Sequence, residues 1–363
     1  MSGFSFGFAG DDIDIDDADV LEVGGQIISQ ETSAASTLPE LVKAQRHDMN
    51  GWLPTLPSQI SYNKCAIKSS HDVGPDATVA RRDVFDIRAQ LMVEDSAEEQ
   101  NGELITGLEK GDIKPNFYEG GFKTWECSID LGRLVAGEQV GGGDRHVIEL
   151  GAGTAVPSLT LFAQLLSETE SGAKRTHFTF ADYNSAVLRL VTLPNLILTW
   201  NYFVTKRNAS ASPDSQRDDA DEEMLDITPD LLSAFQTDLE KRGITISFIS
   251  GAWSPSFVDL VFSVHELAGF DTLILASETI YSPASLLAFS ETLLALLRRP
   301  SAGSRALVAA KKVYFGVGGG VDEFLSVLRT VSESRVRVEE RLDVKSEGVG
   351  RTILEIGIEK GRV

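Results

Sequence analysis

Cysteine is almost absent from this chain. Only Cys65 and Cys127 occur among its 363 residues, so no disulfide framework or cysteine-rich zinc site can be built. Histidine is also rare, and the five histidines have none of the spacings typical of metal ligands. We therefore expect no bound metal, and we interpret His265 as structural. The other histidines are His47, His71, His146 and His177.

Basic side chains are too few to balance the acidic ones. The chain has 33 Lys and Arg against 54 Asp and Glu, a formal net charge of −21. Such a charge repels phosphates, which disfavours direct binding to nucleic acid or to an anionic membrane. A basic protein is the electrostatically natural partner. The alternative is that the acidic excess only keeps the protein in solution.

Long apolar runs are missing as well. Residues 1–8 have neither the charged region nor the long apolar region of a secretory signal. The stretch Leu193–Val204 is apolar but too short, and its apolar run is interrupted by Pro194 and Asn195, so it should not span a bilayer. These features predict a soluble intracellular protein.

The most informative stretch of the chain is His146–Pro157, with the sequence HVIELGAGTAVP. It combines an apolar run, typical of a buried parallel strand, with a glycine turn that lets the backbone approach a ligand. The helix that should follow presents unpaired N–H groups. The spacing of Glu149, Gly151 and Gly153 favours S-adenosyl-L-methionine over a dinucleotide. A purely structural strand-to-helix turn is the alternative.

A second apolar run, His177–Asp182, ends in an acid. Asp182 lies 31 positions after Gly151, where folds of this kind place a carboxylate on the ribose hydroxyls of a nucleotide. Asn184 is expected to cap the next helix. The alternative is that Asp182 is only a polar end to the strand.

From about Pro115, apolar runs alternate with segments of helical periodicity, which predicts a parallel sheet covered by helices. The last two strands are too closely connected for a parallel crossover and must be antiparallel. A seven-stranded, mostly parallel α/β sheet with a terminal antiparallel hairpin is the fold of class I S-adenosylmethionine-dependent methyltransferases. Strands are expected at 146–150, 177–182, 244–250, 271–277, 305–315, 335–343 and 351–358, and helices near 155–168, 185–203, 228–242, 284–298 and 321–332.

The remaining segments suggest how the chain is divided. Residues 1–40 are acidic and rich in Ser and Thr, and we expect a disordered tail. Residues 41–114, including the alternating run Val84–Val93, should form an extension with a few strands that covers the active site. The methyltransferase domain is expected at 115–363, with a disordered acidic insertion at 208–223.

Four further clusters lie where this sheet would place a ligand. Phe117–Ser128 precedes the sheet and mixes small residues with Trp125, and Gly251–Trp253 follows the third strand, where an indole can cover an adenine face. Ala276–Tyr281 ends the fourth strand, and ligands bind at carboxyl strand ends. Phe315–Gly320 should be a mobile loop, and it lacks the Lys-Ser/Thr ending of a phosphate loop. Each cluster has a plainer alternative, with the tryptophans and Cys127 as packing residues and Glu278 as a strand-end charge.

Together these motifs resemble the eukaryotic protein-histidine N-methyltransferase family. The runs Leu188–Leu196 and Ser277–Tyr281 carry most of the specificity, with the glycine turn and the segments around Trp125 and Asp182 beside them. The resemblance covers roughly residues 115–358. It implies S-adenosyl-L-methionine as the cofactor, with contacts that include the glycine turn. The implied cofactor-binding residues are Thr124, Trp125, Glu126, Cys127, Ser128, Gly151, Asp182, Tyr183, Asn184, Gly251, Ala252, Trp253 and Ser277. The glycine-turn motif adds Glu149 and Gly153 to the expected cofactor site.

One residue departs from the family pattern. The family usually has an acid between the glycine and the tryptophan of Gly-x-Trp, where it can accept from the adenine amino group, and Ala252 cannot. Yeast-type members modify a histidine of the third large-subunit ribosomal protein. The resemblance therefore implies a basic ribosomal protein as the substrate of this chain, and we expect a monomer located in cytoplasm and nucleus.

The expected reaction is methyl transfer to an imidazole nitrogen. Glu278 is the candidate acceptor that holds the opposite imidazole N–H, and Tyr281 should shape the pocket. A lysine methyltransferase of the same fold is one alternative, although such enzymes usually have an aspartate where this chain has Glu278. The other alternative, from a different class, is an acidic binding protein that escorts a ribosomal protein.

Overall fold

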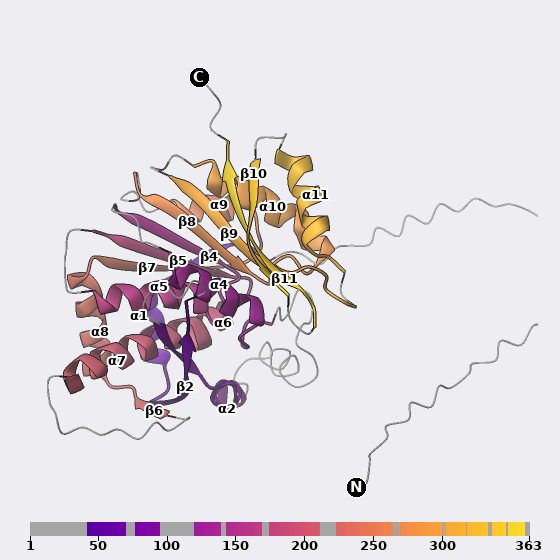
Figure 1. Ribbon diagram of the computed structural model, residues 1–363. Coiled ribbons are helices and arrows are strands. Elements are labelled where there is room, and N and C mark those ends of the chain that lie inside the picture. Colours follow the sequence, from indigo (N-terminus) through magenta and orange to yellow (C-terminus); the bar gives the residue numbers. More distant parts are fainter. Residues whose placement is uncertain are drawn as a thin grey trace, which may run out of the picture. The chain divides into compact units, whose positions relative to one another are not determined.

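The fold is built around one large twisted sheet (Figure 1). The computed structural model describes residues 42–69, 77–94, 120–138, 143–168, 174–210, 223–263, 267, 269–299, 301, 303–316, 318–332, 336–345 and 348–359. The sheet has eight strands in the order β1-β7-β5-β4-β8-β9-β11-β10. They are β1 (Gln45–His47), β4 (Arg145–Leu150), β5 (Thr176–Asp182), β7 (Ile244–Ser250), β8 (Asp271–Ser277), β9 (Ser304–Lys311), β10 (Val336–Val344) and β11 (Arg351–Ile358).

The strand directions confirm the predicted fold class. The five central strands, from β7 to β9, run parallel to one another. Strand β11 pairs antiparallel with both β9 and β10, as the short connection between β10 and β11 requires. This is the class I methyltransferase sheet, and β1 adds an antiparallel strand to its β7 edge. The expected strand 305–315 ends earlier, at Lys311.

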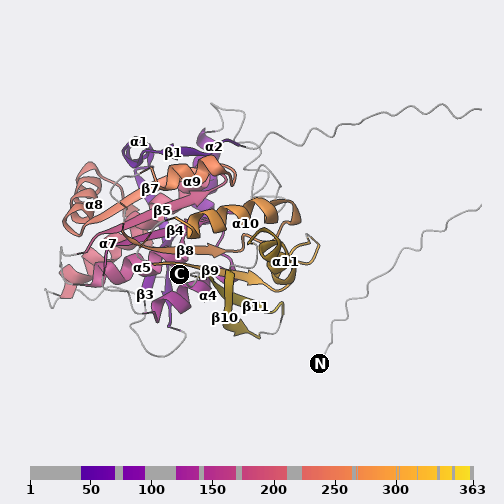
Figure 2. The ribbon, with the colours of Figure 1, turned by 90° about the horizontal axis from the view of Figure 1, so that it is seen from above.

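Helices cover both faces of the sheet (Figure 2). Because successive strand residues point to opposite faces, Val147 contributes to one core and Ile148 to the other. The first core contains buried residues of α4 (Glu126–Ala136), α5 (Val156–Ser167), α7 (Leu193–Ser210) and α8 (Pro229–Lys241). The second contains those of α9 (Pro255–Val261), α10 (Pro283–Leu297) and α11 (Val321–Ser332). The sequence predicted five of these helical segments, and α4 and α9 were missed.

A smaller three-stranded sheet joins the N-terminal extension to the methyltransferase domain. Its order is β3-β2-β6, with β2 (Gln59–Ile67), β3 (Ala77–Arg82) and β6 (Glu223–Asp226). The first turns of the extension are α1 (Met49–Trp52) and a 3-10 turn (Leu53–Thr55). Glu223 accepts hydrogen bonds from Tyr62 and Lys64. The extension is therefore bonded to a strand that lies more than 150 positions later.

The run Val84–Val93 is a helix, so the predicted strand there was wrong. Helix α2 (Val84–Glu94) begins where the Asp83 side chain accepts from the N–H of Phe85, at 2.7 Å. Ile87 and Leu91, four positions apart, are fully buried, whereas Phe85 is 76% exposed. The apparent alternation comes from apolar residues on two helix faces.

The expected helix at 185–203 is confirmed, and it passes through Pro194 and Asn195 without a break. A short helix α6 (Ser185–Val187) and a π-helical turn (Leu188–Thr192) continue directly into α7. In the π-turn, the N–H of Leu193 bonds to Leu188, five residues back, and such turns relieve the strain that a proline imposes. The helical stretch Ser185–Arg207 is long and apolar enough to cross a membrane, but 72% of its apolar window is buried inside the protein, as in a core helix.

The acidic insertion is shorter than predicted. Residues 208–210 end α7, and Glu223 begins β6, so both predicted limits of the insertion at 208–223 were wrong. Residues 211–222 lie outside the described residues, as do the predicted tail 1–40, Phe117 and His265.

Candidate active site

The glycine turn lies where the strand order of the sheet reverses. Strand β4 has β5 on one side and β8 on the other, and crevices at such reversals bind ligands. Gly151 follows β4 with φ +65°, and a Cβ on it would stand 2.8 Å from Thr279 Cγ2, beyond the end of β8. A Cβ on Gly153 would stand 3.1 Å from the carbonyl oxygen of Gly121. The turn therefore requires glycine and brings β4, β8 and the α4 entrance together.

Glu149 faces the protein interior beneath this turn. It is buried, and its carboxylate accepts from the N–H of Ser158 in the first turn of α5, at 3.0 Å. Burial raises the pKa of Glu149 to about 8, although the Ser158 hydrogen bond acts in the opposite direction. The described geometry places Glu149 as a support of the turn, and a cofactor contact from it remains a prediction.

Asp182 is bonded to the same turn. One carboxylate oxygen accepts from the N–H of Gly153 at 3.0 Å, and the other from the N–H of Asn184 at 3.2 Å. Asn184 occupies the predicted N-cap position of α6, but its side chain makes no capping bond. Its Nδ2 atom is buried and has no hydrogen-bond partner among the described residues. Tyr183, next to it, is half-buried, and its carbonyl accepts from Gly251.

The start of α4 lies beside the glycine turn. Thr124 is within hydrogen-bond distance of Thr154, with 3.1 Å between the two hydroxyls. Trp125 is the N-cap of α4, and its indole N–H donates to the Gly120 carbonyl at 2.9 Å. The Ser128 hydroxyl donates to the Trp125 carbonyl. This places four of the predicted cofactor residues on one helix start: Trp125, Glu126, Cys127 and Ser128.

Cys127 is a packing residue with a protonated thiol. It is 1% exposed, and burial, followed by the negative charge of Glu278, raises the pKa of the Cys127 thiol far above its usual range. A thiol in this environment is a poor nucleophile. The alternative interpretation of Cys127 as a small packing residue agrees with this geometry.

The turn after β7 is covered by the N-terminal extension. The N–H of Ala252 donates to the Val42 carbonyl at 2.9 Å, and a Cβ on Gly251 would stand 2.7 Å from the Lys43 carbonyl oxygen. The Trp253 ring packs edge-on against Phe257, with centroids 5.2 Å apart. Trp253 is thus partly a core residue, and its predicted role over an adenine remains a prediction.

Glu278 has a rare backbone conformation at the end of β8. Its φ is +55°, in the left-handed region, and such strain concentrates at functional sites. Its Oε2 atom accepts from the Tyr314 hydroxyl at 2.6 Å. Its Oε1 atom is buried, accepts no hydrogen bond from the described residues, and lies 3.8 Å from Lys311 Nζ. Tyr281 lies nearby, with its ring 6.3 Å from that of Tyr314.

Sequence reasoning missed Lys311 and Tyr314. Lys311 ends β9, and its Nζ lies 3.3 Å from Glu126 and 5.3 Å from the centroid of the Trp125 ring. The segment was expected to be a strand through residue 315, which would have carried Tyr314 away from the site. The sequence did contain a signal for Lys311, because the pair Lys311 and Lys312 ends the apolar run of β9. A charged side chain at the carboxyl end of a parallel strand lies on the side of the sheet where ligands bind.

Several orphaned polar atoms converge on this end of the sheet. Asn184 Nδ2, Glu278 Oε1 and Thr279 Oγ1 are buried without a hydrogen-bond partner among the described residues. Buried polar groups are nearly always bonded, so unpaired ones need an explanation. Ser277, the last residue of β8, is half-buried. These atoms, together with the glycine turn, fit a polar nucleotide-like cofactor.

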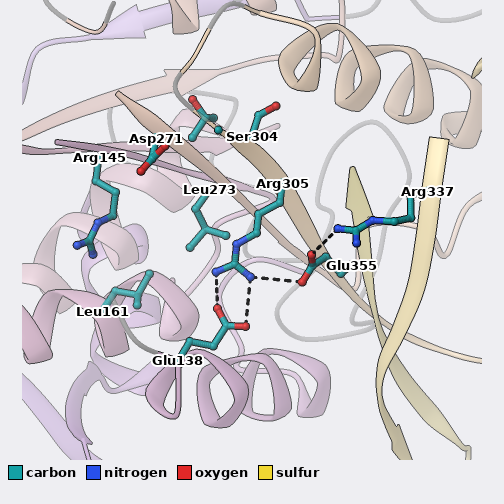
Figure 3. A pocket seen from close by; sticks show the side chains of 11 residues that line it. Glu138, Arg145, Leu161, Asp271, Leu273, Ser304, Arg305, Arg337 and Glu355 are labelled. Atoms are coloured by element: carbon teal, nitrogen blue, oxygen red, sulfur yellow. Dashed lines mark hydrogen bonds and ion pairs between the residues drawn. The ribbon is translucent and has the colours of Figure 1, made fainter. Parts of the chain in front are cut away.

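The opposite end of the sheet carries a pocket of a different kind. A cavity of about 450 Å³ lies at the amino ends of β4, β8 and β9. Figure 3 shows Arg305 between Glu138 and Glu355, with Arg337 reaching Glu355 from β10. Because Glu138 and Glu355 are already paired with arginines and the cavity lies away from the glycine turn, we assign it no part in the chemistry. Among the described residues, no cluster of His, Cys, Asp or Glu could hold a metal ion.

Comparison with known proteins identifies the family. No family model matches the chain. Histidine protein methyltransferase 1 of Saccharomyces cerevisiae is 38% identical over 293 residues, which cover 77% of this chain and 76% of the relative. The Schizosaccharomyces pombe protein of the same name is 33% identical over 354 residues, covering 97% and 92%. The chain belongs to the histidine protein methyltransferase family. A Bos taurus homolog in this family is 32% identical over 68% of this chain and 57% of its own length.

Family membership confirms that the protein is a methyltransferase, as the sequence motifs predicted. Solved structures are much more distant. Precorrin-6y C5,15-methyltransferase from Geobacter metallireducens matches 66% of this chain and 94% of its own at 14% identity and a TM-score of 0.32. The N-methyltransferase NodS from Bradyrhizobium japonicum, in complex with S-adenosyl-L-homocysteine, matches 60% and 80% at 10% identity and a TM-score of 0.30. The assignment rests on the sequence relatives.

Proposed function

We propose that this protein transfers a methyl group from S-adenosyl-L-methionine to an imidazole nitrogen of a histidine in a basic ribosomal protein, with the third large-subunit protein as the expected target. The family supports the histidine methyltransferase activity. The glycine turn after β4, the acid that ends β5 and the unpaired polar atoms beside them support the methyl donor.

The residues that would hold the donor lie on three strand ends and one helix start. When bound, S-adenosyl-L-methionine supplies an electrophilic methyl group. Asn184 offers an amide N–H group without a partner among the described residues, and Asp182 offers a carboxylate that the N–H groups of Gly153 and Asn184 hold in place. Ala252 has no side-chain acceptor, and its own N–H is engaged by Val42. The adenine amino group must therefore find its acceptor elsewhere.

Imidazole requires little activation before it attacks a methyl group. With a reference pKa near 6.5, most histidine side chains are neutral at pH 7. The enzyme must instead align the nucleophile and fix which ring nitrogen carries the proton. An acceptor that binds the remote N–H does both.

The observation that carries this proposal is Oε1 of Glu278, which has Lys311 at ion-pair distance but no hydrogen-bond donor among the described residues. It is a buried carboxylate oxygen at the reactive end of the sheet. An imidazole N–H is a suitable donor to it. Because the methylated imidazole is a cation, the attraction to Glu278 increases as the methyl group moves, so the interaction acts mainly on the transition state. Tyr281 would form a wall of this pocket.

The substrate part of the proposal rests on charge. A protein of net charge −21 attracts basic partners, and ribosomal proteins are typically basic. We propose that the enzyme acts as a monomer in cytoplasm and nucleus, where such a protein can be met before assembly.

Mass spectrometry tests the function directly. The purified protein is incubated with S-adenosyl-L-methionine and a purified large-subunit ribosomal protein, and the product is sequenced by fragmentation. Methylhistidine is the expected product. Methyllysine would instead support the lysine-directed alternative, and tight binding of the ribosomal protein without turnover would support an escort role. Cells that lack the gene should have lost the same methylhistidine.

A further inference from the structure

The Tyr314 hydroxyl is held between a main-chain donor and a carboxylate. It accepts from the N–H of Lys311 at 3.2 Å and donates to Glu278 Oε2 at 2.6 Å. Burial, followed by the negative charge of Glu278, raises the pKa of the Tyr314 phenol above its usual range. The phenol therefore stays protonated and remains a donor at every pH at which the protein works.

The Glu278 carboxylate lies near a second possible donor, Lys311. Lys311 Nζ lies 3.8 Å from Oε1, within the range of an ion pair. The same ammonium also pairs with Glu126 at 3.3 Å and lies over the Trp125 ring. An ammonium is a strong donor on a flexible stem. Lys311 therefore lies next to the oxygen that the imidazole needs, at ion-pair rather than hydrogen-bond distance.

The backbone around Tyr314 is fixed on both sides. The N–H of Gly318 donates to the Tyr314 carbonyl at 3.2 Å, which closes the turn that starts the glycine loop. A Cβ on Gly319 would stand 2.6 Å from the Tyr281 carbonyl oxygen, so the loop packs directly on the segment after Glu278. The backbone that carries the phenol is thus held by contacts other than the bond to Glu278, so this bond can orient the carboxylate.

We propose that Tyr314 is a positioning residue for methyl transfer: its hydroxyl occupies Oε2 of Glu278 and so presents Oε1 to the remote N–H of the target imidazole. This role rests on the proposed function. Tyr314 touches neither the imidazole nor the methyl donor in this arrangement, and it acts only through Glu278. None of the methyltransferase motifs in the sequence includes Tyr314.

The Tyr314→Phe variant tests this role, since it removes the hydroxyl and keeps the ring. The rate at saturating substrate should fall on the order of tenfold, the usual scale for losing one hydrogen bond to a charged group. The Michaelis constant for the target protein and the calorimetric affinity for S-adenosyl-L-methionine should stay within about twofold. Tyr202→Phe, which removes a hydroxyl from α7 far along the chain, is the matched control and should keep the wild-type rate.

A double-mutant cycle with Glu278→Gln separates positioning from general support of the fold. If Tyr314 acts through Glu278, Tyr314→Phe should cause no further loss in the Glu278→Gln background. A full additional tenfold loss there would overturn the proposal. A wild-type rate for Tyr314→Phe, or a fall in its melting temperature together with lost cofactor binding, would also overturn it. Wild-type protein that makes no methylhistidine would instead remove the proposed function itself.

Discussion

The Arg82 guanidinium donates to the main-chain carbonyl of Leu190 at 3.0 Å. That carbonyl lies four residues before Pro194, which has no N–H to give it. The main-chain N–H of Arg82 also donates to the Asn195 side chain at 2.7 Å, and Asn195 in turn donates to the Thr154 carbonyl in the glycine turn. Strand β3 of the extension thus supports the motif helix and, through it, the proposed cofactor turn.

Arg82→Met should destabilise the protein by about 2 kcal/mol. The substitution keeps an apolar side chain of similar length but leaves the buried Leu190 carbonyl and the Asp86 carboxylate without their donor. Denaturant unfolding at pH 7 measures the change. Arg81→Met, one position along β3, removes only a half-buried bond to Asn63 and serves as the control. Equal losses of unfolding free energy in the two variants would mean that the bond from Arg82 to the Leu190 carbonyl contributes no extra stability.

Gly151→Arg should abolish cofactor binding in a protein that still folds. Its Cβ would stand 2.8 Å from Thr279 Cγ2, and φ +65° is unfavourable for any residue with a side chain. Gly51→Arg is the matched control, because no atom lies within 4 Å of a Cβ at that position. Calorimetric titration with S-adenosyl-L-methionine gives the affinity, and thermal melting checks the fold. Unchanged affinity in a folded Gly151→Arg protein would remove the turn from the cofactor site.

The buried histidine pair should make the stability depend on pH below neutrality. Burial, followed by the neighbouring His177, lowers the pKa of His146 to about 3. Burial, followed by the charge of Arg46, lowers the pKa of His177 to about 4. The unfolded chain, with a histidine pKa near 6.5, takes up protons first. The stabilisation is therefore complete above about pH 6.5 and is lost as the pH falls from there through about 4 and then 3.

One variant can test how much stability the buried histidines lose between pH 7 and pH 5. Between pH 7 and pH 5, linkage predicts a loss of about 2 kcal/mol for each buried histidine. Replacing His177 by Gln keeps a polar partner for Thr245, to which the imidazole is bonded at 2.7 Å. The variant should lose about 2 kcal/mol less than the wild type over the same pH range, measured by urea unfolding. Identical pH dependence in the two proteins would contradict the depressed pKa of His177.

Glu278→Gln should lower the single-turnover rate on a histidine-bearing target by on the order of a hundredfold. The amide keeps the shape but is a weaker acceptor and carries no charge to stabilise the developing imidazolium. Cofactor affinity should be nearly unchanged. Glu291→Gln, on the exposed side of α10, is the control for the loss of one negative charge. A wild-type rate would leave Glu278 a strand-end charge, and the acceptor would have to be another residue.

Association with a basic target should weaken steeply between low and physiological salt. Exposed charges are screened beyond about 8–10 Å, and the attraction proposed here comes from a net charge of −21. Cofactor binding, which is local and partly buried, should barely change over the same range. Fluorescence anisotropy with a labelled ribosomal protein measures target binding, and calorimetry measures cofactor binding. Target binding that ignores salt would show that shape alone provides recognition.

Apolar runs that end in turn residues were read correctly from the sequence. The predicted limits of β8, β11 and α11 agree with the observed ones, because each is a short apolar or amphipathic segment between glycine and polar residues. The run Val84–Val93 failed because a two-residue alternation and a helix with two apolar faces look alike in a short window. Only tertiary packing, in which Ile87 and Leu91 are buried, distinguishes them.

The site was predictable to the extent that it lies on strand ends. Gly151, Asp182 and Glu278 lie at the carboxyl ends of three neighbouring strands, β4, β5 and β8. The sequence could therefore place them at the same edge of the sheet. Tyr314 reaches the site through the turn that follows Lys311, the last residue of β9, and no periodicity predicts the direction of a turn. The cover of the Gly251 turn by Val42 could not be predicted either, because that contact joins segments about two hundred residues apart.

The pairing of β2 with β6, and of β1 with β7, has a consequence for synthesis. Gln59 pairs with Asp226, and Gln45 with Ser250. The ribosome releases the extension first, yet the partner residue of Gln59 is made 167 residues later and that of Gln45 205 residues later. During that time strands β1 and β2 expose unpaired edges, which are prone to wrong association. Chaperones should therefore be needed mainly for the N-terminal extension while the rest of the chain is being made. A circular permutant in which the extension is synthesised last should need less help from chaperones to fold.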